Sequence, residues 1–192
     1  MARTKRISDA AVLAVAADLV GRVGPRRLTL ADVAAETGLS PATLVQRFGS
    51  KRQLLLAVAA RGADGVTRLA EARDGPGSTV DRLVGGLVAL AEPVGRPEEL
   101  VNHLAFLQLD LRDDAFRAHA GAFARSFDAA VREVLDAAVA AGELSATDTT
   151  ALARRVQVTY HGALLTWALA GTGPLAVELE QQLRATLASA RA

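Results

Sequence analysis

Four polar side chains between residues 43 and 51 are spaced to recognise nucleic acid. Thr43, Gln46 and Arg47 lie three and four positions apart, so on a helix over residues 41–47 they share one side. Amide and guanidinium groups bond base edges in the major groove, and a hydroxyl bonds either a base or a phosphate. Lys51 suits a phosphate held beside free backbone N–H groups. This spacing predicts a DNA-contacting helix followed by a phosphate clamp.

The same short helix also carries small and apolar side chains. Leu44 and Phe48 are four positions apart and are expected to point inward, against a helix that precedes them in the chain. Pro41, Ala42 and Val45 then remain on the side of the groove, where Ala42 and Val45 suit contact with a thymine methyl group.

Residues 28–56 contain the elements that must position these side chains. They read as a short helix, a tight turn, a second short helix and the start of a third. Gly38 supplies the positive φ that ends a helix, Ser40 is a good N-cap, and Pro41 stands at the first helical position. Two short helices joined by a glycine turn predict a helix-turn-helix, whose second helix lies in the major groove.

Thr29 is placed to cap the first of these two helices, with Asp32 three positions later. Its hydroxyl either faces a phosphate or serves only as the cap. Arg3, Lys5 and Arg6 precede the first helix as an arm that either reaches phosphates or aids solubility.

Composition favours an all-α chain. Hydrophobic residues make up 51% of the 192 residues, aromatic residues only 4%, and apolar spacings of three and four dominate over alternation. The absence of cysteine excludes disulfides and thiolate zinc sites and suits a cytoplasmic protein. No stretch approaches 18 uninterrupted apolar residues, so we expect a soluble chain with no membrane partner.

Charge is unevenly distributed along the chain. Residues 1–54 hold nine basic and four acidic residues, for a net charge of +5, whereas the remainder carries −4. A basic N-terminal quarter around the predicted helix-turn-helix fits a surface that attracts phosphates.

Residues 8–60 resemble the DNA-binding domain of the tetracycline-repressor (TetR) family. The resemblance rests on a combination of short segments rather than on any one of them. The matching pieces are Gly24 at the end of the first helix, Leu30-Ala31-Asp32-Val33-Ala34, Gly38-Leu39-Ser40, Ala42-Thr43-Leu44, Phe48-Gly49-Ser50-Lys51 and Leu54-Leu55. One position departs from the family pattern: Val45 stands where the family commonly has a tyrosine that contacts the DNA backbone.

The resemblance implies two domains, which we place at residues 1–54 for DNA binding and 55–192 for effector binding and dimerisation. A long helix from about residue 50 to 72 is expected to join them, in a total of about nine helices. The resemblance also implies a homodimer built by the last two helices. Gly162, Ala163 and Ala168 in the eighth helix support it independently, because small side chains allow close helix approach.

A regulatory domain of this family implies an effector pocket among its middle helices. Aromatic and apolar residues of those helices, together with one histidine, are the candidates, although core packing explains the phenylalanines better and an exposed or core position explains the histidine better. The set is His103, Phe106, Leu107, Phe123, Phe127 and Trp167. An apolar lining favours a small hydrophobic effector.

Catalytic, metal and cofactor chemistry has no support in the sequence. His103, His119 and His161 lack the spacing of metal ligands, and no glycine-rich phosphate loop or nucleophile elbow is present. We therefore expect no enzyme, no metal and no cofactor. The predicted function is a ligand-responsive repressor that binds a pseudo-palindromic operator in double-stranded DNA as a dimer. The alternative is an all-α small-molecule-binding protein whose DNA binding has weakened or been lost.

Overall fold

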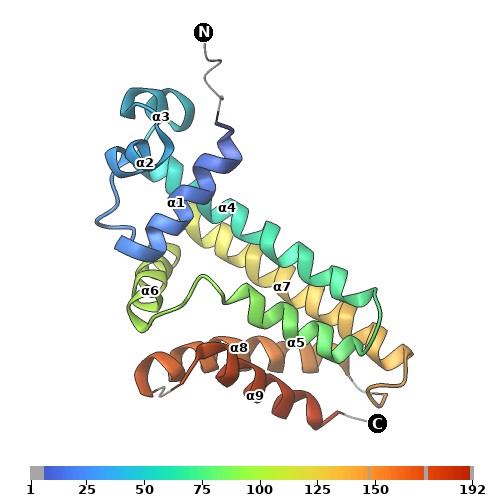
Figure 1. Cartoon of the computed structure of the whole chain (residues 1–192). Coiled ribbons are helices and arrows are strands. Elements are labelled where there is room, and N and C mark those ends of the chain that lie inside the picture. Colours follow the sequence, from blue (N-terminus) through green and yellow to red (C-terminus); the bar gives the residue numbers. More distant parts are fainter. Residues whose placement is uncertain (1–6, 147, 171–172, 191–192) are drawn as a thin grey trace. The chain divides into compact units, whose positions relative to one another are not determined.

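The computed structural model describes residues 7–146, 148–170 and 173–190. Within these ranges the chain forms nine α-helices and one 3₁₀ turn, and no strand (Figure 1). The all-α prediction is therefore confirmed. The helices are α1 (Asp9–Val23), α2 (Leu30–Thr37), α3 (Pro41–Phe48), α4 (Lys51–Ala70), η1 (Glu71–Arg73), α5 (Thr79–Leu90), α6 (Pro97–Arg112), α7 (Asp114–Ala140), α8 (Thr149–Ala170) and α9 (Leu175–Ala188).

The chain divides into two compact units. Unit 1 comprises Met1–Arg61 and Val101–Ala120, and unit 2 comprises Gly62–Leu100 and Gly121–Ala192. The units therefore share α4, α6 and α7. These units are defined by which residues pack together. The predicted boundary after residue 54 separates two functions instead, and it stays a prediction.

Unit 1 has its own hydrophobic core. Buried aliphatic side chains of α1, α2, α3 and the start of α4 pack together with Phe116 of α7. Phe106 of α6 meets the Phe116 ring edge-on, with 5.8 Å between the centroids. Asn102 of α6 donates a hydrogen bond of 2.7 Å from Nδ2 to the carbonyl of Gly21, which satisfies a carbonyl in the last turn of α1.

Local signals fix the helix ends in unit 1. Ser8, Thr29 and Ser40 each accept a hydrogen bond from a backbone N–H of the first turn, which satisfies a donor that the helix leaves unpaired. Ser50 Oγ likewise accepts from Gln53 N at 3.2 Å, at the start of α4. The caps at Thr29 and Ser40 are the ones that the sequence predicts.

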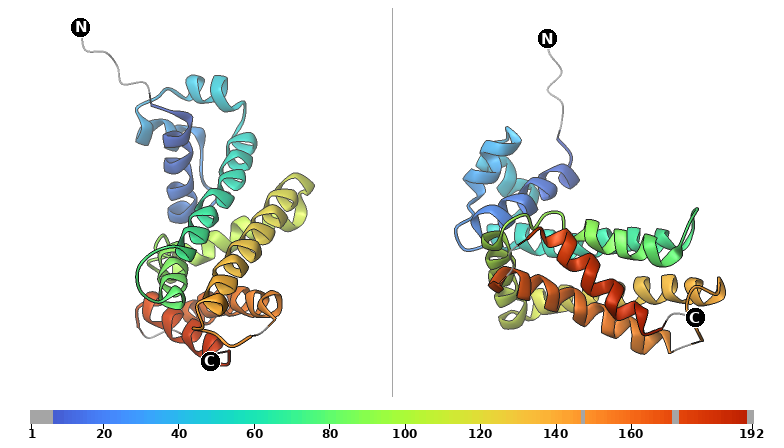
Figure 2. Two further views of the ribbon diagram at one scale, coloured as in Figure 1. Left: turned by 90° about the vertical axis from the view of Figure 1, so that its right-hand side faces the viewer. Right: turned by 60° about the horizontal axis from the view of Figure 1, so that its bottom comes forward.

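Unit 2 is organised around α8 and α9. The two helices lie side by side, and α9 also packs against α5 (Figures 1 and 2). Leu175, Leu179, Leu183 and Leu187 form a buried stripe along α9, as their spacing of four indicates. Phe127 of α7 is fully buried in the same core, 5.5 Å from the Tyr160 ring. Burial raises the pKa of the Tyr160 hydroxyl.

The start of α5 is held by Glu143, from the turn after α7. Its carboxylate accepts hydrogen bonds from Ser78 Oγ at 2.7 Å, Thr79 N at 2.7 Å and Val80 N at 3.1 Å. Partial burial raises the pKa of Glu143, but these hydrogen bonds outweigh it and bring the pKa from 4.5 to about 2. A carboxylate at a helix N-terminus is also favoured by the helix dipole.

None of the helices in the described ranges is both long and apolar enough to cross a membrane.

Candidate nucleic-acid interface

Gly38 makes the turn between α2 and α3. It adopts the left-handed conformation, with φ of 68°, and its N–H donates to the carbonyl of Ala34. Leu39 N then donates to the same carbonyl at 3.1 Å, which completes the C-terminal cap. Ser40 and Pro41 start α3 directly after this turn. The two helices and their glycine turn therefore have the predicted helix-turn-helix arrangement.

Only one side of α3 is committed to the core. Leu44 is fully buried, and Phe48 packs at the edge of the unit 1 core. Ala42 and Gln46 are exposed, and Val45 is 48% exposed. Ala42, Val45 and Gln46 therefore lie outward, as the spacing of Leu44 and Phe48 predicts, and their contact with a groove stays a prediction.

Ser40 and Thr43 bond each other at the start of α3. Ser40 Oγ accepts from Thr43 N at 3.1 Å, and the two hydroxyls are 2.9 Å apart. Both hydroxyls therefore support the helix end, and Thr43 is half-buried.

Arg47 is turned toward the start of α1. Its Nε lies 2.7 Å from Asp9 Oδ1, its Nη2 donates to the carbonyl of Ile7 at 3.1 Å, and Nη2 also pairs with the Asp9 carboxylate. The Arg47 side chain is only 21% exposed. In this arrangement the guanidinium joins α3 to α1 instead of pointing outward. Sequence reasoning missed Asp9 as its partner, because an ion pair 38 positions apart leaves no local signal.

Thr29 and Asp32 form a reciprocal capping box at the start of α2. Thr29 Oγ1 accepts from Asp32 N at 3.2 Å and donates to Asp32 Oδ2 at 2.8 Å, while Thr29 N donates to the same oxygen at 2.7 Å. These hydrogen bonds from Thr29 hold the pKa of Asp32 below its ordinary value. The hydroxyl proton of Thr29 is thus engaged by Asp32.

Lys51 begins α4 and lies beside the loop that follows α1. Its Nζ donates to the carbonyl of Arg26 at 2.9 Å, and its side chain is half-buried. Arg52, the next residue, forms a two-pronged ion pair with Asp113, with nitrogen–oxygen distances of 2.7 to 3.1 Å. Arg52 lowers the pKa of Asp113 chiefly through these hydrogen bonds. Arg26 and Arg52 are therefore additional basic groups near Lys51 that the sequence did not single out.

The predicted basic arm, Arg3, Lys5 and Arg6, lies outside the described residues.

The six predicted effector residues fall in different units. His103, Phe106 and Leu107 belong to unit 1, and Phe123, Phe127 and Trp167 belong to unit 2. Phe106 packs at the edge of the unit 1 core, whereas Leu107 is 44% exposed.

The three effector candidates of unit 2 lie in or against its core. Phe127 is fully buried and Trp167 is 7% exposed, and the Phe123 and Phe127 rings lie 6.3 Å apart. Trp167 Nε1 donates to the carbonyl of Gly173 at 2.8 Å, which ties the end of α8 to the segment before α9. Core packing accounts for all three side chains.

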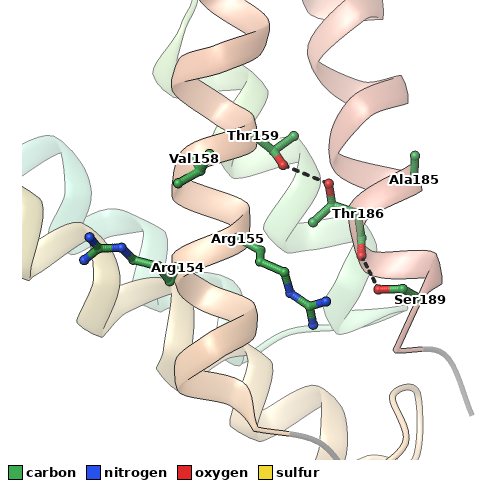
Figure 3. A pocket seen from close by; sticks show the side chains of 7 residues that line it. All are labelled: Arg154, Arg155, Val158, Thr159, Ala185, Thr186 and Ser189. Carbon is green, nitrogen blue, oxygen red and sulfur yellow. Dashed lines mark hydrogen bonds between the residues drawn. The ribbon is translucent and has the colours of Figure 1, made fainter.

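A further surface of unit 2 exposes aliphatic side chains. Val158, Leu165 and Leu169 on α8 are 65%, 45% and 78% exposed, and Val177 on α9 is 60% exposed. Beside them, α8 and α9 border a cavity of about 360 Å³ that reaches from Val158 to Ser189 (Figure 3). Thr159 and Thr186 bond each other across it at 2.9 Å. We call the four exposed aliphatic side chains the α8–α9 aliphatic patch.

Comparison with known families identifies the N-terminal segment. Residues 12–58 match the model of the bacterial regulatory proteins of the tetR family. No curated protein matches the chain in sequence.

Comparison with solved structures extends the likeness to the whole chain. The TetR-family transcriptional regulator PfmR from Thermus thermophilus matches with a TM-score of 0.66 and 21% identity, over 92% of this chain and 97% of PfmR. SmeT, the repressor of the Stenotrophomonas maltophilia multidrug efflux pump SmeDEF, matches with a TM-score of 0.67 and 18% identity, over 97% of this chain and 92% of SmeT. The SmeT–triclosan complex matches with a TM-score of 0.71 and 20% identity, over 96% and 91% of the two chains. At these identities the likeness shows the fold.

Proposed function

We propose that this chain, which belongs to the tetR family of bacterial regulatory proteins through residues 12–58, is a repressor that leaves its operator when a small molecule binds. The observation that carries the proposal is the exposed side of α3. Leu44 packs in the core and holds the helix there, while the exposed Ala42, Val45 and Gln46 remain available to a major groove.

Gln46 is the residue we assign to direct base recognition. Its exposed amide offers a donor and an acceptor, the pair that a glutamine uses on the edge of an adenine. Ala42 and Val45 supply apolar contact with thymine methyl groups. Thr43 and Ser40 shape the start of the helix and contact the backbone or a base from there.

Arg47 acts in this proposal by one of two routes. While paired with Asp9 it holds α3 against α1 and so fixes the angle at which α3 enters the groove. On DNA, a phosphate or a guanine replaces Asp9 as the partner of the guanidinium. Asp9 is 65% exposed, so water already screens this ion pair from one side and its exchange for a phosphate or a base costs little.

Backbone phosphates are contacted from the flanks of α3. Lys51 begins α4 beside the free N–H groups of its first turn, a favourable place for an anion. Thr29 contributes through the start of α2, once its hydroxyl turns from Asp32 to a phosphate. Val45 offers no hydrogen bond at the position where a tyrosine is common, so fewer phosphate contacts and a shallower salt dependence are expected.

A homodimer formed through α8 and α9 completes the proposal. The α8–α9 aliphatic patch consists of exposed aliphatic side chains of the kind that protein interfaces bury. A twofold axis there presents two copies of α3 to the half-sites of a pseudo-palindrome, roughly 34 Å apart for one turn of DNA.

Release is driven by a small, largely apolar effector. The candidate residues are His103, Phe106 and Leu107 in unit 1 and, as a separate set, Phe123, Phe127 and Trp167 in unit 2, chosen for their aromatic or aliphatic character. The complex of SmeT with triclosan supports an apolar effector class. Binding shifts the population toward conformations in which the two recognition helices no longer fit the half-site spacing. Such a repressor works in the cytoplasm.

One observation favours a second function. Arg47 is paired with Asp9, and the exposed Val45 side chain has no hydrogen-bonding group. Few side chains of α3 are therefore available to form hydrogen bonds with DNA. These features suit a small-molecule-binding protein with weakened or lost DNA binding.

A gel-shift titration separates the two functions. The probe is the DNA upstream of the protein's own coding sequence, and the competitor is a shuffled duplex of equal length. The proposal expects retardation of the upstream probe at protein concentrations at least about a thousandfold below those needed for the shuffled duplex, with affinity falling as salt rises. Equal affinity for both duplexes, or no retardation at low salt, contradicts operator recognition and favours the second function.

A further inference from the structure

Unit 1 contains a cavity of about 310 Å³ that shares no residue with the predicted effector set. We call it the α4–α7 cavity, because the starts of these two helices border it. Its apolar wall consists of Leu55 and Phe116, both buried, and the half-buried Leu109. Pro25, from the loop after α1, adds a further buried apolar group.

Three cationic side chains stand at the same cavity. Arg52 is balanced by Asp113, its two-pronged partner, and its guanidinium lies 5.8 Å from the centre of the Phe116 ring. The other two donate to neutral oxygens: Arg26 Nη2 to Gln108 Oε1 at 3.3 Å, and Lys51 Nζ to the carbonyl of Arg26 at 2.9 Å. Lys51 also acts electrostatically on the Asp32 carboxylate, which does not border the cavity. The residues that line the cavity therefore include three positively charged side chains and one carboxylate.

We propose that the α4–α7 cavity binds a small amphipathic monoanion, namely a carboxylate carried on a flat apolar ring. The ring packs between Leu55, Leu109 and Phe116, and the carboxylate meets Arg26 and Lys51 at the rim. A carboxylate forms stronger hydrogen bonds with these cations than the neutral oxygens that now accept from them. The volume lies at the lower end of the roughly 300–1,000 Å³ found for small-molecule sites, which limits the ligand to about two fused rings.

The site has a consequence for DNA that rests on the proposed function. Lys51 is one of the groups assigned to backbone phosphates, so a carboxylate held on Lys51 competes with a phosphate for the same ammonium group. Binding of the anion itself requires no DNA, so it can be measured whether or not the proposed function holds.

Isothermal titration calorimetry of the full chain without DNA tests the binding claim. The probes are 2-naphthoate, its neutral isostere 2-naphthamide, and inorganic phosphate. We expect 2-naphthoate to bind once per chain and at least about tenfold more tightly than either of the other two, because only it offers both an anion and an apolar ring. Equal affinity for naphthoate and naphthamide shows a merely apolar pocket, and equal affinity for phosphate shows a simple phosphate site. Either result, or no binding, overturns the proposal.

Matched variants locate the bound probe. Arg26→Gln should weaken naphthoate binding about tenfold, whereas Arg27→Gln, an exposed arginine next to it that does not border the cavity, should change it less than twofold. Leu109→Trp fills the cavity and should abolish binding, with an unchanged helical circular dichroism spectrum as the check on folding. Similar losses for both arginine variants, or full binding by the tryptophan variant, would place the anion elsewhere on unit 1 or unit 2 and contradict the assignment.

Discussion

Helices α3 and α8 both expose much of their surface, but the exposed side chains differ in kind. On α3 the outward side carries the small Ala42 and the amide of Gln46, with Val45 as its single half-exposed aliphatic group. On α8 the outward side carries Val158, Leu165 and Leu169, each with 45% or more of its surface exposed. A polar and sparsely apolar side suits hydrated, charged DNA, whereas an aliphatic side requires cover by another protein surface.

The two helices also differ in how they are held. Six residues of α8 are buried in the core of unit 2. In contrast, α3 fully buries only Leu44 and is held further by the partly buried Phe48, by its caps and by the Arg47–Asp9 ion pair. The helix that we assign to DNA is thus short and held by few contacts, and single changes there should have effects that are easy to resolve.

The largest effect is expected for Leu44→Ala. Leu44 is fully buried, so its truncation should lower the free energy of unfolding by about 3 kcal/mol, measured by urea denaturation. Val45→Ala is the matched control on the exposed side and should change stability by less than about 0.5 kcal/mol. Similar losses for the two variants would mean that α3 does not have one inner and one outer side.

The next effect concerns the outward side of α8. Leu165→Glu places a charge in the α8–α9 aliphatic patch and should raise the dimer dissociation constant about 30-fold, or about 2 kcal/mol, in analytical ultracentrifugation. Ala140→Glu, at an exposed position on α7, is the control and should leave the constant unchanged. A monomeric wild-type protein, or an unaffected Leu165→Glu dimer, would refute the interface assigned to α8.

A smaller effect is expected where unit 2 caps α5. Glu143→Gln removes the negative charge that accepts three hydrogen bonds, and should cost about 1.5 kcal/mol of stability at pH 7. The pKa of Glu143 is lowered from 4.5 to about 2 in the fold, so its contribution is present above pH 4.5 and is lost as the pH falls from about 4.5 to about 2. The difference between wild type and variant should therefore shrink on acidification over that window. Glu133→Gln, about half exposed, is the control, and a difference that grows toward low pH would be inconsistent with the assignment.

The smallest effect is expected at the cap of α2. Thr29→Ala removes both hydroxyl bonds of the capping box and should destabilise the protein by about 1 kcal/mol, while Thr29→Ser should recover most of the loss. Thermal unfolding followed by circular dichroism measures both. If Thr29→Ser is as unstable as Thr29→Ala, the hydroxyl is not the stabilising group.

Unit 1 could be predicted closely because its signals are local. Thr29, Gly38 and Ser40 each determine a helix end through atoms within five residues, and the helices begin and end where these residues indicate. The spacing of Leu44 and Phe48 likewise identified the inner side of α3. In unit 2, Ser78 before α5 and the leucine stripe of α9 are local signals of the same kind.

The parts that escaped prediction depend on residues distant in sequence. Asp9 forms an ion pair with Arg47, and Asp113 forms one with Arg52 across 61 positions. Glu143 caps a helix that begins 64 positions earlier. Side-chain type alone does not determine which partner a charged group selects. Apolar character likewise does not distinguish a ligand-binding side chain from a core side chain. The predicted effector residues therefore include Phe127 and Trp167, whose burial is accounted for by core packing.

The most direct test of the account compares Gln46→Ala with Gln182→Ala, the same change on α9, in fluorescence anisotropy on the duplex that the protein retards. Loss of the base contact should weaken binding by about 1–3 kcal/mol for Gln46→Ala and should relax discrimination at one base pair of each half-site, whereas Gln182→Ala should bind like wild type. Unchanged affinity and unchanged base preference in Gln46→Ala would contradict the claim that the exposed side of α3 reads DNA.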